Sequence, residues 1–132
     1  MIGVDTNVLV RFFVRDDMRQ GASAERFMNE RTTDDPAFVS VVAIVELAWA
    51  LEQIYQYQRQ QIVSAVALLL GSGNVVVEDE ELVKAAIAEV SAVNITVVDC
   101  LIARIALEAG ATSTVTFDRD AARRVPGMEL LK

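Results

Sequence analysis

The chain has 132 residues, of which 53% are hydrophobic, with only 2 prolines and 6 glycines. This composition excludes a disordered or fibrous protein, because such chains are poor in apolar residues or rich in proline and glycine. A net charge of −7 argues against a large nonspecific nucleic-acid surface and leaves room for a local one. The length predicts a single domain over residues 1–132 with a substantial core.

The sequence contains no membrane or export signal. Its longest nearly continuous apolar segment, residues 39–51, is too short to cross a bilayer and contains Glu46. Asp5 interrupts the N-terminal apolar residues, unlike the apolar region of a signal peptide. One cysteine and no histidine exclude a disulfide framework and an ordinary Cys/His zinc site. We therefore expect a cytoplasmic protein with no membrane association.

Short apolar segments alternate with stretches of helical periodicity along the whole chain. The first kind predicts strands at residues 1–4, 37–39, 74–77, 113–117 and 128–131. The second kind predicts helices at residues 8–14, 18–31, 41–57, 58–70, from 78 to beyond 90, 99–109 and 121–125. This alternation predicts an α/β fold, a three-layer α/β/α sandwich around a mostly parallel sheet of four or five strands.

Capping residues support several of these boundaries. Asp16 or Asp17 is a suitable N-cap for the second helix, and Ser40 for the third. The acidic run at residues 78–81 is interpreted as a solvated helix start rather than a metal site, because acids are favoured at helix N-termini. The second helix is predicted to turn three residues inward, Ala22, Phe27 and Met28.

Four acidic residues share a placement at the end of an apolar segment or in the first turns of the helix after it. They are Asp5, Glu46, Asp99 and Asp118. The carboxyl ends of parallel strands emerge at one edge of a sheet, where ligands bind in open α/β folds. Taken singly, Asp99 and Asp118 have a simpler explanation as helix caps. For Glu46, flanked on its helix face by Val42 and Trp49, two interpretations stay open: a buried carboxylate with a partner, or one that reaches water.

Several carboxylates gathered closely repel each other unless a cation is present. Mg²⁺ and Mn²⁺ are hard cations that prefer oxygen ligands, so an all-oxygen divalent-metal site is the economical hypothesis. The chain has no histidine base and no glycine-rich phosphate loop with its lysine. Neither Lys84 nor Lys132 lies near the predicted acidic edge. The remaining chemistry is hydrolysis by metal-activated water.

The acidic motifs, in order, resemble those of PIN-domain ribonucleases, and the length resembles that of the VapC toxins of bacterial and archaeal toxin–antitoxin pairs. The motifs are residues 5–10 (DTNVLV), 45–47 (VEL), 99–103 (DCLIA) and 116–120 (TFDRD). The resemblance covers essentially the whole chain. It implies a Mg²⁺- or Mn²⁺-dependent endoribonuclease that is a homodimer and is neutralised by a cognate antitoxin protein.

The resemblance also implies roles for individual residues. Asp5 and Asp99 would be the principal metal ligands, with Glu46 and Asp118 completing the site directly or through water. Supporting roles fall to three polar residues and one further acid that could replace or assist Asp118: Thr6, Asn7, Thr116 and Asp120. Candidate phosphate contacts, most of them better explained as surface salt bridges, are Arg11, Arg15, Arg104, Arg119, Arg123 and Arg124.

Two alternatives remain at this stage. One is a PIN-like binding or regulatory module that acts through protein partners, against which the presence of all four acids speaks. The other is a flap-type nuclease acting on branched DNA, although the chain lacks the long insertions and basic extensions of such enzymes. The apolar helix faces leave room for a dimer or antitoxin interface, or are ordinary core.

Overall fold

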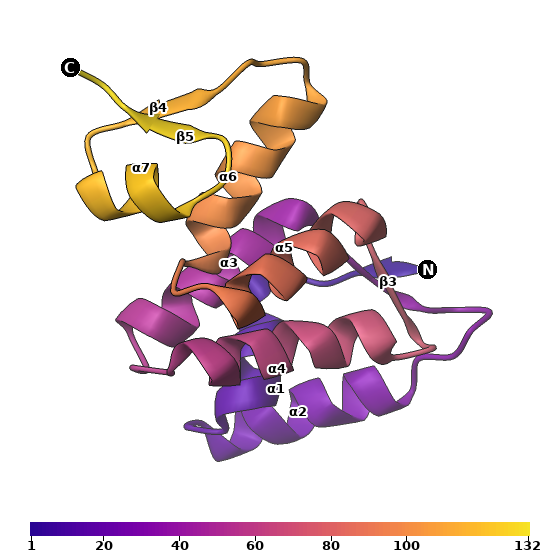
Figure 1. Ribbon diagram of the computed structural model, residues 1–132. Helices are drawn as coiled ribbons and strands as arrows, with labels where there is room; N and C mark the ends of the chain where they lie inside the picture. The colour runs from indigo at the N-terminus through magenta and orange to yellow at the C-terminus, as the bar shows by residue number, and fades with distance from the viewer. The chain divides into compact units, whose positions relative to one another are not determined.

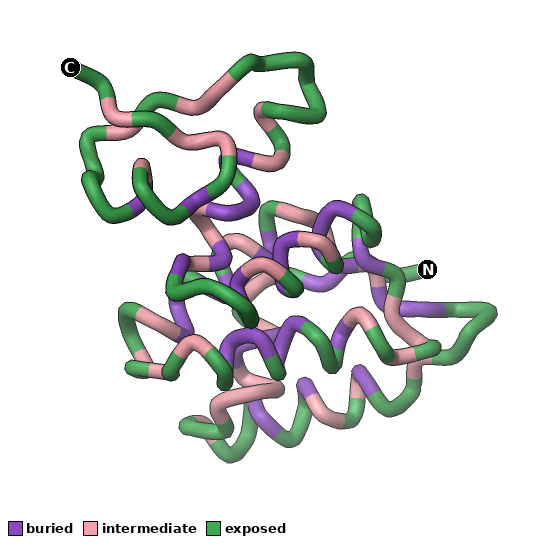
Figure 2. Tube along the Cα trace, viewed as in Figure 1, coloured by how far each residue is buried: buried purple, intermediate pink, exposed green.

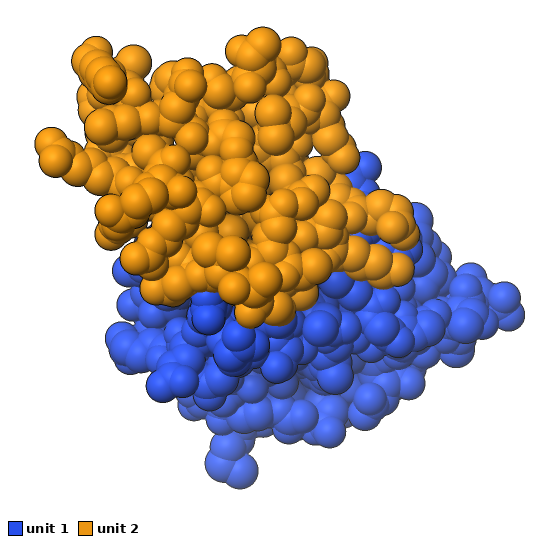
Figure 3. Space-filling view, viewed as in Figure 1, with its two compact units in different colours: residues 1–80 blue, residues 81–132 orange.

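The computed structural model describes residues 1–132, and these form two compact units. Unit 1 comprises residues 1–80 and unit 2 residues 81–132 (Figure 3). None of the helices is both long and apolar enough to cross a membrane. Whether residues 1–132 act as one domain stays a prediction.

Unit 1 is an α/β arrangement of three strands and four helices (Figure 1). In chain order these are β1 (Ile2–Gly3), α1 (Thr6–Val14), α2 (Met18–Asn29), β2 (Ala37–Val39), α3 (Val41–Gln53), α4 (Arg59–Gly71) and β3 (Val75–Val77). The strands pair in parallel in the order β1-β2-β3. Helix α1 packs against α2 and α3, and α4 packs against α3 and β3. All three strands therefore end at the same edge of this sheet.

Local sequence explains where the helices of unit 1 begin. Asp17 accepts a hydrogen bond from the Gln20 amide at 2.9 Å, and Ser40 accepts one from the Ala43 amide at 3.1 Å. Both predicted N-caps are confirmed. The apolar stripes of these helices and strand β2 supply the core of the unit (Figure 2), whose largest fully buried side chains are Leu9, Val39, Ile44, Leu47, Leu51, Val66 and Leu69.

Unit 2 contains the remaining two strands. After α5 (Glu80–Ala92), which begins at the boundary, it continues with α6 (Val97–Glu108), β4 (Thr114–Thr116), α7 (Arg119–Arg124) and β5 (Met128–Leu130). Strands β4 and β5 pair in parallel, with Thr114 opposite Met128. Gly127 has φ +88°, and a Cβ there would lie 2.9 Å from Leu107 Cδ1. This turn into β5 therefore requires glycine.

The α/β class, the five strands and their parallel pairing are as the sequence predicted. The strands form one sheet of three and one of two, however, and not a single hydrogen-bonded ladder. Helix α3 ends at Gln53 and not at residue 57, since Gln56 adopts φ 53° and the Tyr57 amide bonds back to the Leu51 carbonyl at 2.8 Å. Left-handed backbone at one residue is incompatible with a continuing helix.

The predicted inward face of α2 is wrong at Ala22, which is exposed. The helix buries Gly21, Ala24 and Met28 instead. At Gly21 a Cβ would lie 3.5 Å from the Arg11 carbonyl oxygen on α1, an ordinary van der Waals distance. The glycine thus lies on the packed face of the helix, and apolar periodicity alone does not count glycine as a core residue.

Candidate active site

Asp5 lies where β1 passes into α1. The Val4 amide still donates to the Phe38 carbonyl of β2 at 2.9 Å, and Asp5 then caps α1 with extended backbone. Its Oδ1 accepts a hydrogen bond from the Thr6 amide at 2.9 Å, while its Oδ2 lies 3.5 Å from Asn7 Nδ2. The residue is exposed. One carboxylate oxygen therefore holds the helix start, and the other has at most a long contact.

Glu46 lies in the second turn of α3, the helix that follows β2. It is exposed, and its neighbours Val42 and Trp49 are 66% and 54% exposed. Of the two interpretations left open by the sequence, the one in which Glu46 reaches water is confirmed. Because β1 and β2 are parallel neighbours, Asp5 and Glu46 both follow strands that end at the same edge of the sheet in unit 1.

Glu78 is an acid at this edge whose role the sequence analysis missed. It follows β3, and its Oε1 accepts a hydrogen bond from the Val41 amide at 2.8 Å. Val41 is the first residue of α3, whose early amides have no partner inside the helix. Glu78 therefore caps the helix that carries Glu46. The interpretation of residues 78–81 as a helix start holds only from Glu80 onward; the signal missed was an acid directly after a third parallel strand.

Asp99 occupies the third position of α6, which begins at Val97 because Thr96 caps it. The Asp99 amide donates to Thr96 Oγ1 at 3.0 Å. Its side chain is half-buried in the first turn, where the helix dipole favours a negative charge. The predicted position in the first turn of this helix is confirmed, whereas the simpler interpretation of Asp99 as the helix cap is wrong, because Thr96 is the N-cap.

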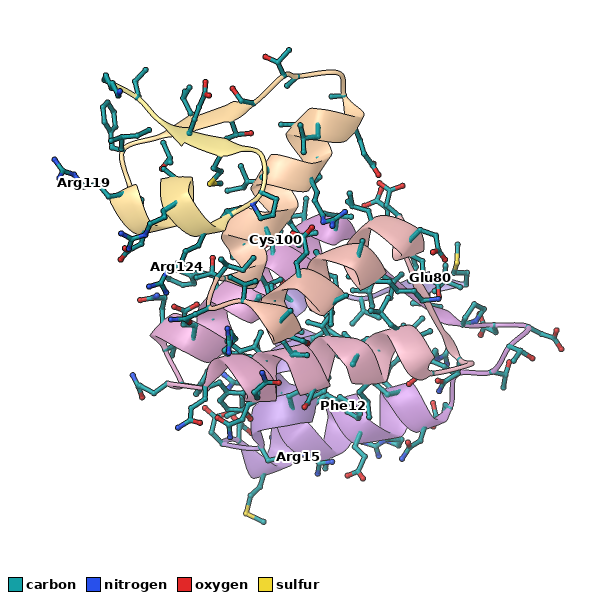
Figure 4. The ribbon with its side chains drawn as sticks, in the orientation of Figure 1. Phe12, Arg15, Glu80, Cys100, Arg119 and Arg124 are labelled. Atoms are coloured by element: carbon teal, nitrogen blue, oxygen red, sulfur yellow. The ribbon has the colours of Figure 1, made fainter.

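A polar cluster behind Asp99 was also missed from the sequence. The thiol of Cys100, labelled on α6 in Figure 4, donates to Glu89 Oε2 at 3.0 Å, and Arg104 donates to the other oxygen of the same carboxylate. Burial, followed by the hydrogen bond and the charge of Glu89, raises the pKa of the Cys100 thiol to about 12. These contacts join α5 to the first turns of α6. No motif in the sequence pairs positions 89 and 100.

Asp118 and Asp120 have different partners although both lie near the start of α7. Asp118 Oδ1 accepts hydrogen bonds from the amides of Asp120 and Ala121 at 2.9 and 3.0 Å, so it is the N-cap. The amide of Asp118 itself donates to Thr116 Oγ1 at 3.0 Å. Asp120 is instead ion-paired with Arg123 at 2.6 Å. The cap interpretation of Asp118 is confirmed, and its second oxygen remains available.

Most of the candidate phosphate-binding arginines are engaged in ion pairs, as the sequence analysis expected. Arg11 pairs with Asp16 at 2.7 Å, Arg15 pairs with Glu25 at 2.9 Å, and Arg104 pairs with Glu89. Arg119 makes no ion pair, and its side chain extends away from α7 into solvent (Figure 4). Contact of any of these arginines with RNA stays a prediction.

The four predicted acids divide equally between the two units: Asp5 and Glu46 belong to unit 1, and Asp99 and Asp118 belong to unit 2. The structure contains no group of three or more His, Cys, Asp or Glu side chains arranged to hold a metal ion. The meeting of all four acids stays a prediction. As donors they suit Mg²⁺ or Mn²⁺, since all are carboxylates and none forms an ion pair within its own unit.

The model of the PIN-domain family matches residues 2–127. The chain therefore belongs to the PIN-domain family, and it has the nuclease-type fold of that family. The seven helices and the parallel strands are consistent with the predicted three-layer α/β/α class. A search of curated proteins finds no match to this chain.

Proposed function

We propose that the protein is a Mg²⁺- or Mn²⁺-dependent endoribonuclease that hydrolyses RNA phosphodiester bonds. The observation that carries the proposal is a PIN-family match over nearly the whole chain, combined with an Asp5 whose carboxylate is exposed directly after β1. The carboxyl end of a parallel strand is where α/β folds place their ligands. Glu46 follows the neighbouring strand at the same edge.

In this proposal Asp5 and Asp99 are the principal metal ligands, and Glu46 and Asp118 complete the site directly or through water. A bound divalent cation would lower the pKa of the attacking water and stabilise the leaving oxygen. The chain has no histidine, so carboxylates are the side chains available to accept the proton of that water. Thr6, Asn7 and Thr116 lie next to the acids in sequence, and Thr116 holds the backbone of Asp118 through its hydroxyl.

The biological role proposed is that of the toxin in a type II toxin–antitoxin pair, acting in the cytoplasm as a homodimer and neutralised by a cognate antitoxin. Support comes from the family match and from the resemblance of the four motifs to VapC toxins. Induced expression of the chain alone should arrest cell growth, whereas the Asp5→Asn variant should not. Growth arrest by both proteins would separate toxicity from nuclease activity.

The direct test is cleavage of total RNA by purified protein freed of any partner, with Mg²⁺ or Mn²⁺ and with EDTA. Asp5→Asn should abolish cleavage without unfolding the protein, because asparagine also caps helices well. Asp34→Asn is the matched control, since Asp34 is exposed and lies in the turn before β2. It should cleave like the wild type.

Metal-dependent cleavage that is lost only in Asp5→Asn would support the nuclease, and the fragments would identify the RNA. Wild-type turnover in Asp5→Asn would contradict the assignment of the site. Absence of cleavage by a folded, partner-free wild-type protein would favour the alternative, a PIN-like binding module acting through protein partners. Cleavage restricted to branched DNA would favour a flap-type nuclease.

A further inference from the structure

Unit 1 contains an open hollow with a volume of about 510 Å³ beside Asp5. Its walls come from the end of β1, from α1 and from α2. Val4 and Ala24 are buried, and Val8 and Phe27 are half-buried, so these four supply an apolar surface. A hollow of this size falls within the roughly 300–1,000 Å³ range of small-molecule sites.

Polar groups line the same hollow around the apolar residues. Gln20 accepts a hydrogen bond from Arg11 Nε at 2.8 Å through its side-chain oxygen, which leaves the amide hydrogens of Gln20 as donors. Ser23 and Asn7 also line the hollow, and both are exposed. Asn7 uses its nitrogen toward Asp5, which leaves its oxygen as an acceptor. The hollow therefore offers both donors and acceptors beside an apolar surface.

Three of the side chains that line the hollow, those of Arg11, Gln20 and Phe27, are held in place before any ligand binds. Arg11 is fixed by Gln20 and by Asp16, and Asp16 also accepts a hydrogen bond from the Tyr55 hydroxyl at 3.3 Å. The Phe27 ring is held by the Arg31 guanidinium, which lies 4.6 Å from its centroid. Preformed contacts of this kind lower the entropy cost of binding.

We propose that this hollow binds one unstacked base of single-stranded RNA, next to the phosphodiester presented to Asp5. A nucleobase has apolar faces and a polar edge with donors and acceptors, which matches the lining. Proteins commonly recognise single-stranded RNA through such splayed bases, stacked on aromatic side chains and hydrogen-bonded at their edges. The inference rests on the proposed nuclease function, because it makes Asp5 and the hollow parts of one substrate site.

The consequence is a preference for unpaired RNA and for particular bases at one position relative to the cleaved bond. A base stacked inside a duplex cannot enter the hollow without unpairing. Gln20, Ser23 and Asn7 would then select the base, while the apolar residues supply sequence-independent contact. An apolar side chain from a protein partner would not need these polar groups.

The test measures binding of a dye-labelled ten-nucleotide single-stranded RNA, with Ca²⁺ in place of Mg²⁺ and with the integrity of the probe checked on a gel. Ser23→Phe places a ring in the hollow and should weaken binding about tenfold, since base stacking contributes about 1–3 kcal/mol per base. Ala22→Phe is the matched control. Ala22 is exposed on the same helix and does not line the hollow, so this variant should bind like the wild type.

Abasic scanning makes the assignment specific to one base. A single abasic position in the probe should weaken wild-type binding about tenfold, and the same change should have no effect on Ser23→Phe. Should Ser23→Phe fail to fold by circular dichroism, Gln20→Ala replaces it, with Gln60→Ala on α4 as the control. Gln20→Ala should then change which base is preferred at that position.

The outcomes separate this inference from the nuclease proposal. Equal RNA affinity of Ser23→Phe and Ala22→Phe, with cleavage intact, overturns the base pocket and leaves the nuclease. If one abasic position weakens RNA binding by the wild type but not by Ser23→Phe, and the wild type cleaves no RNA, the base pocket is supported and the nuclease proposal is contradicted. A wild-type protein that binds no RNA overturns both.

Discussion

The thiol of Cys100 donates a hydrogen bond to the carboxylate of Glu89 across 3.0 Å. The other oxygen of that carboxylate accepts a hydrogen bond from Arg104, so one acid on α5 binds two residues of α6. Cys100 is fully buried, and the Glu89 and Arg104 side chains are 25% and 30% exposed. This cluster therefore holds the segment of α6 from Cys100 to Arg104, directly after Asp99, and it makes two measurable properties of the protein depend on Glu89.

The first property is the reactivity of the thiol. With a pKa of about 12 in the folded protein against 9.0 for an ordinary cysteine, the thiolate fraction at pH 8 falls on the order of a thousandfold. The rate at which a disulfide reagent modifies Cys100 at pH 8, measured with EDTA present, should be lower by that factor in the native protein than in the protein unfolded in urea. The thiol has a lower pKa in the unfolded chain than in the folded protein, so it ionises first in the unfolded chain as the pH rises. The free energy of unfolding should therefore decline between about pH 9 and 12. The Cys100→Ala variant should lack this part of the decline. Rapid modification of native protein at pH 8 would contradict the assignment.

The second property is stability toward removal of the arginine. Arg104→Ala leaves the Glu89 carboxylate half-buried without its cationic partner, and should lower the free energy of unfolding by about 1–3 kcal/mol. Arg123→Ala is the matched control, because the side chains of its ion pair are exposed, Arg123 at 68% and Asp120 at 73%. This substitution should change the free energy of unfolding by less than about 1 kcal/mol. Urea denaturation measures both. Equal effects of the two substitutions would show that burial of the Glu89 pair contributes nothing.

The elements of the fold were predictable because local patterns determine them. Ser40 and Asp17 are good N-caps. The apolar segments at residues 37–39 and 75–77 are too short for helices, and the second consists of three valines. The pairing of the strands was less predictable, because it depends on contacts between residues far apart in sequence. The predicted end of α3 was wrong because no glycine or proline near residue 56 indicates that the backbone becomes left-handed there, at Gln56.

The acids of the candidate site could be placed at strand ends and helix starts, but their partners could not. Helix capping by Asp118 follows from its position before a short helix, so it was expected. The hydrogen bond of Glu78 to Val41 joins residues 37 apart, and no local pattern predicts it. The same holds for Glu89 and Cys100. Sequence patterns thus identified the candidate metal ligands. The residues that hold the helices carrying these ligands, Glu78 and Glu89, could be found only from the structure.

Asp118 and Asp120 can be distinguished by substitution with asparagine. Asn at position 118 still accepts the amide hydrogen bonds that cap α7, so stability should change by less than about 0.5 kcal/mol. If Asp118 is the fourth acid, Asp118→Asn should nevertheless lower the rate of RNA cleavage about tenfold to a hundredfold, because removing a group that holds a metal site together has effects of about that size. Asp120→Asn loses only an exposed ion pair and should cleave normally. If only Asp120→Asn lost RNA cleavage, Asp120 and not Asp118 would be the fourth acid of the site.

Glu78 provides the last test, because a helix cap and a metal ligand respond differently to glutamine. Glu78→Ala removes the acceptor for the Val41 amide and should lower stability by about 1–2 kcal/mol, whereas Glu81→Ala, at a side chain 90% exposed, should have little effect. Glu78→Gln keeps an oxygen that can accept the same hydrogen bond, so it should restore most of the stability. If Glu78 acts only by holding the start of α3, and through it Glu46, then Glu78→Gln should also restore the rate of RNA cleavage. A glutamine variant that is stable but inactive would instead place Glu78 among the metal ligands, because the neutral amide is a much weaker ligand for Mg²⁺ than a carboxylate.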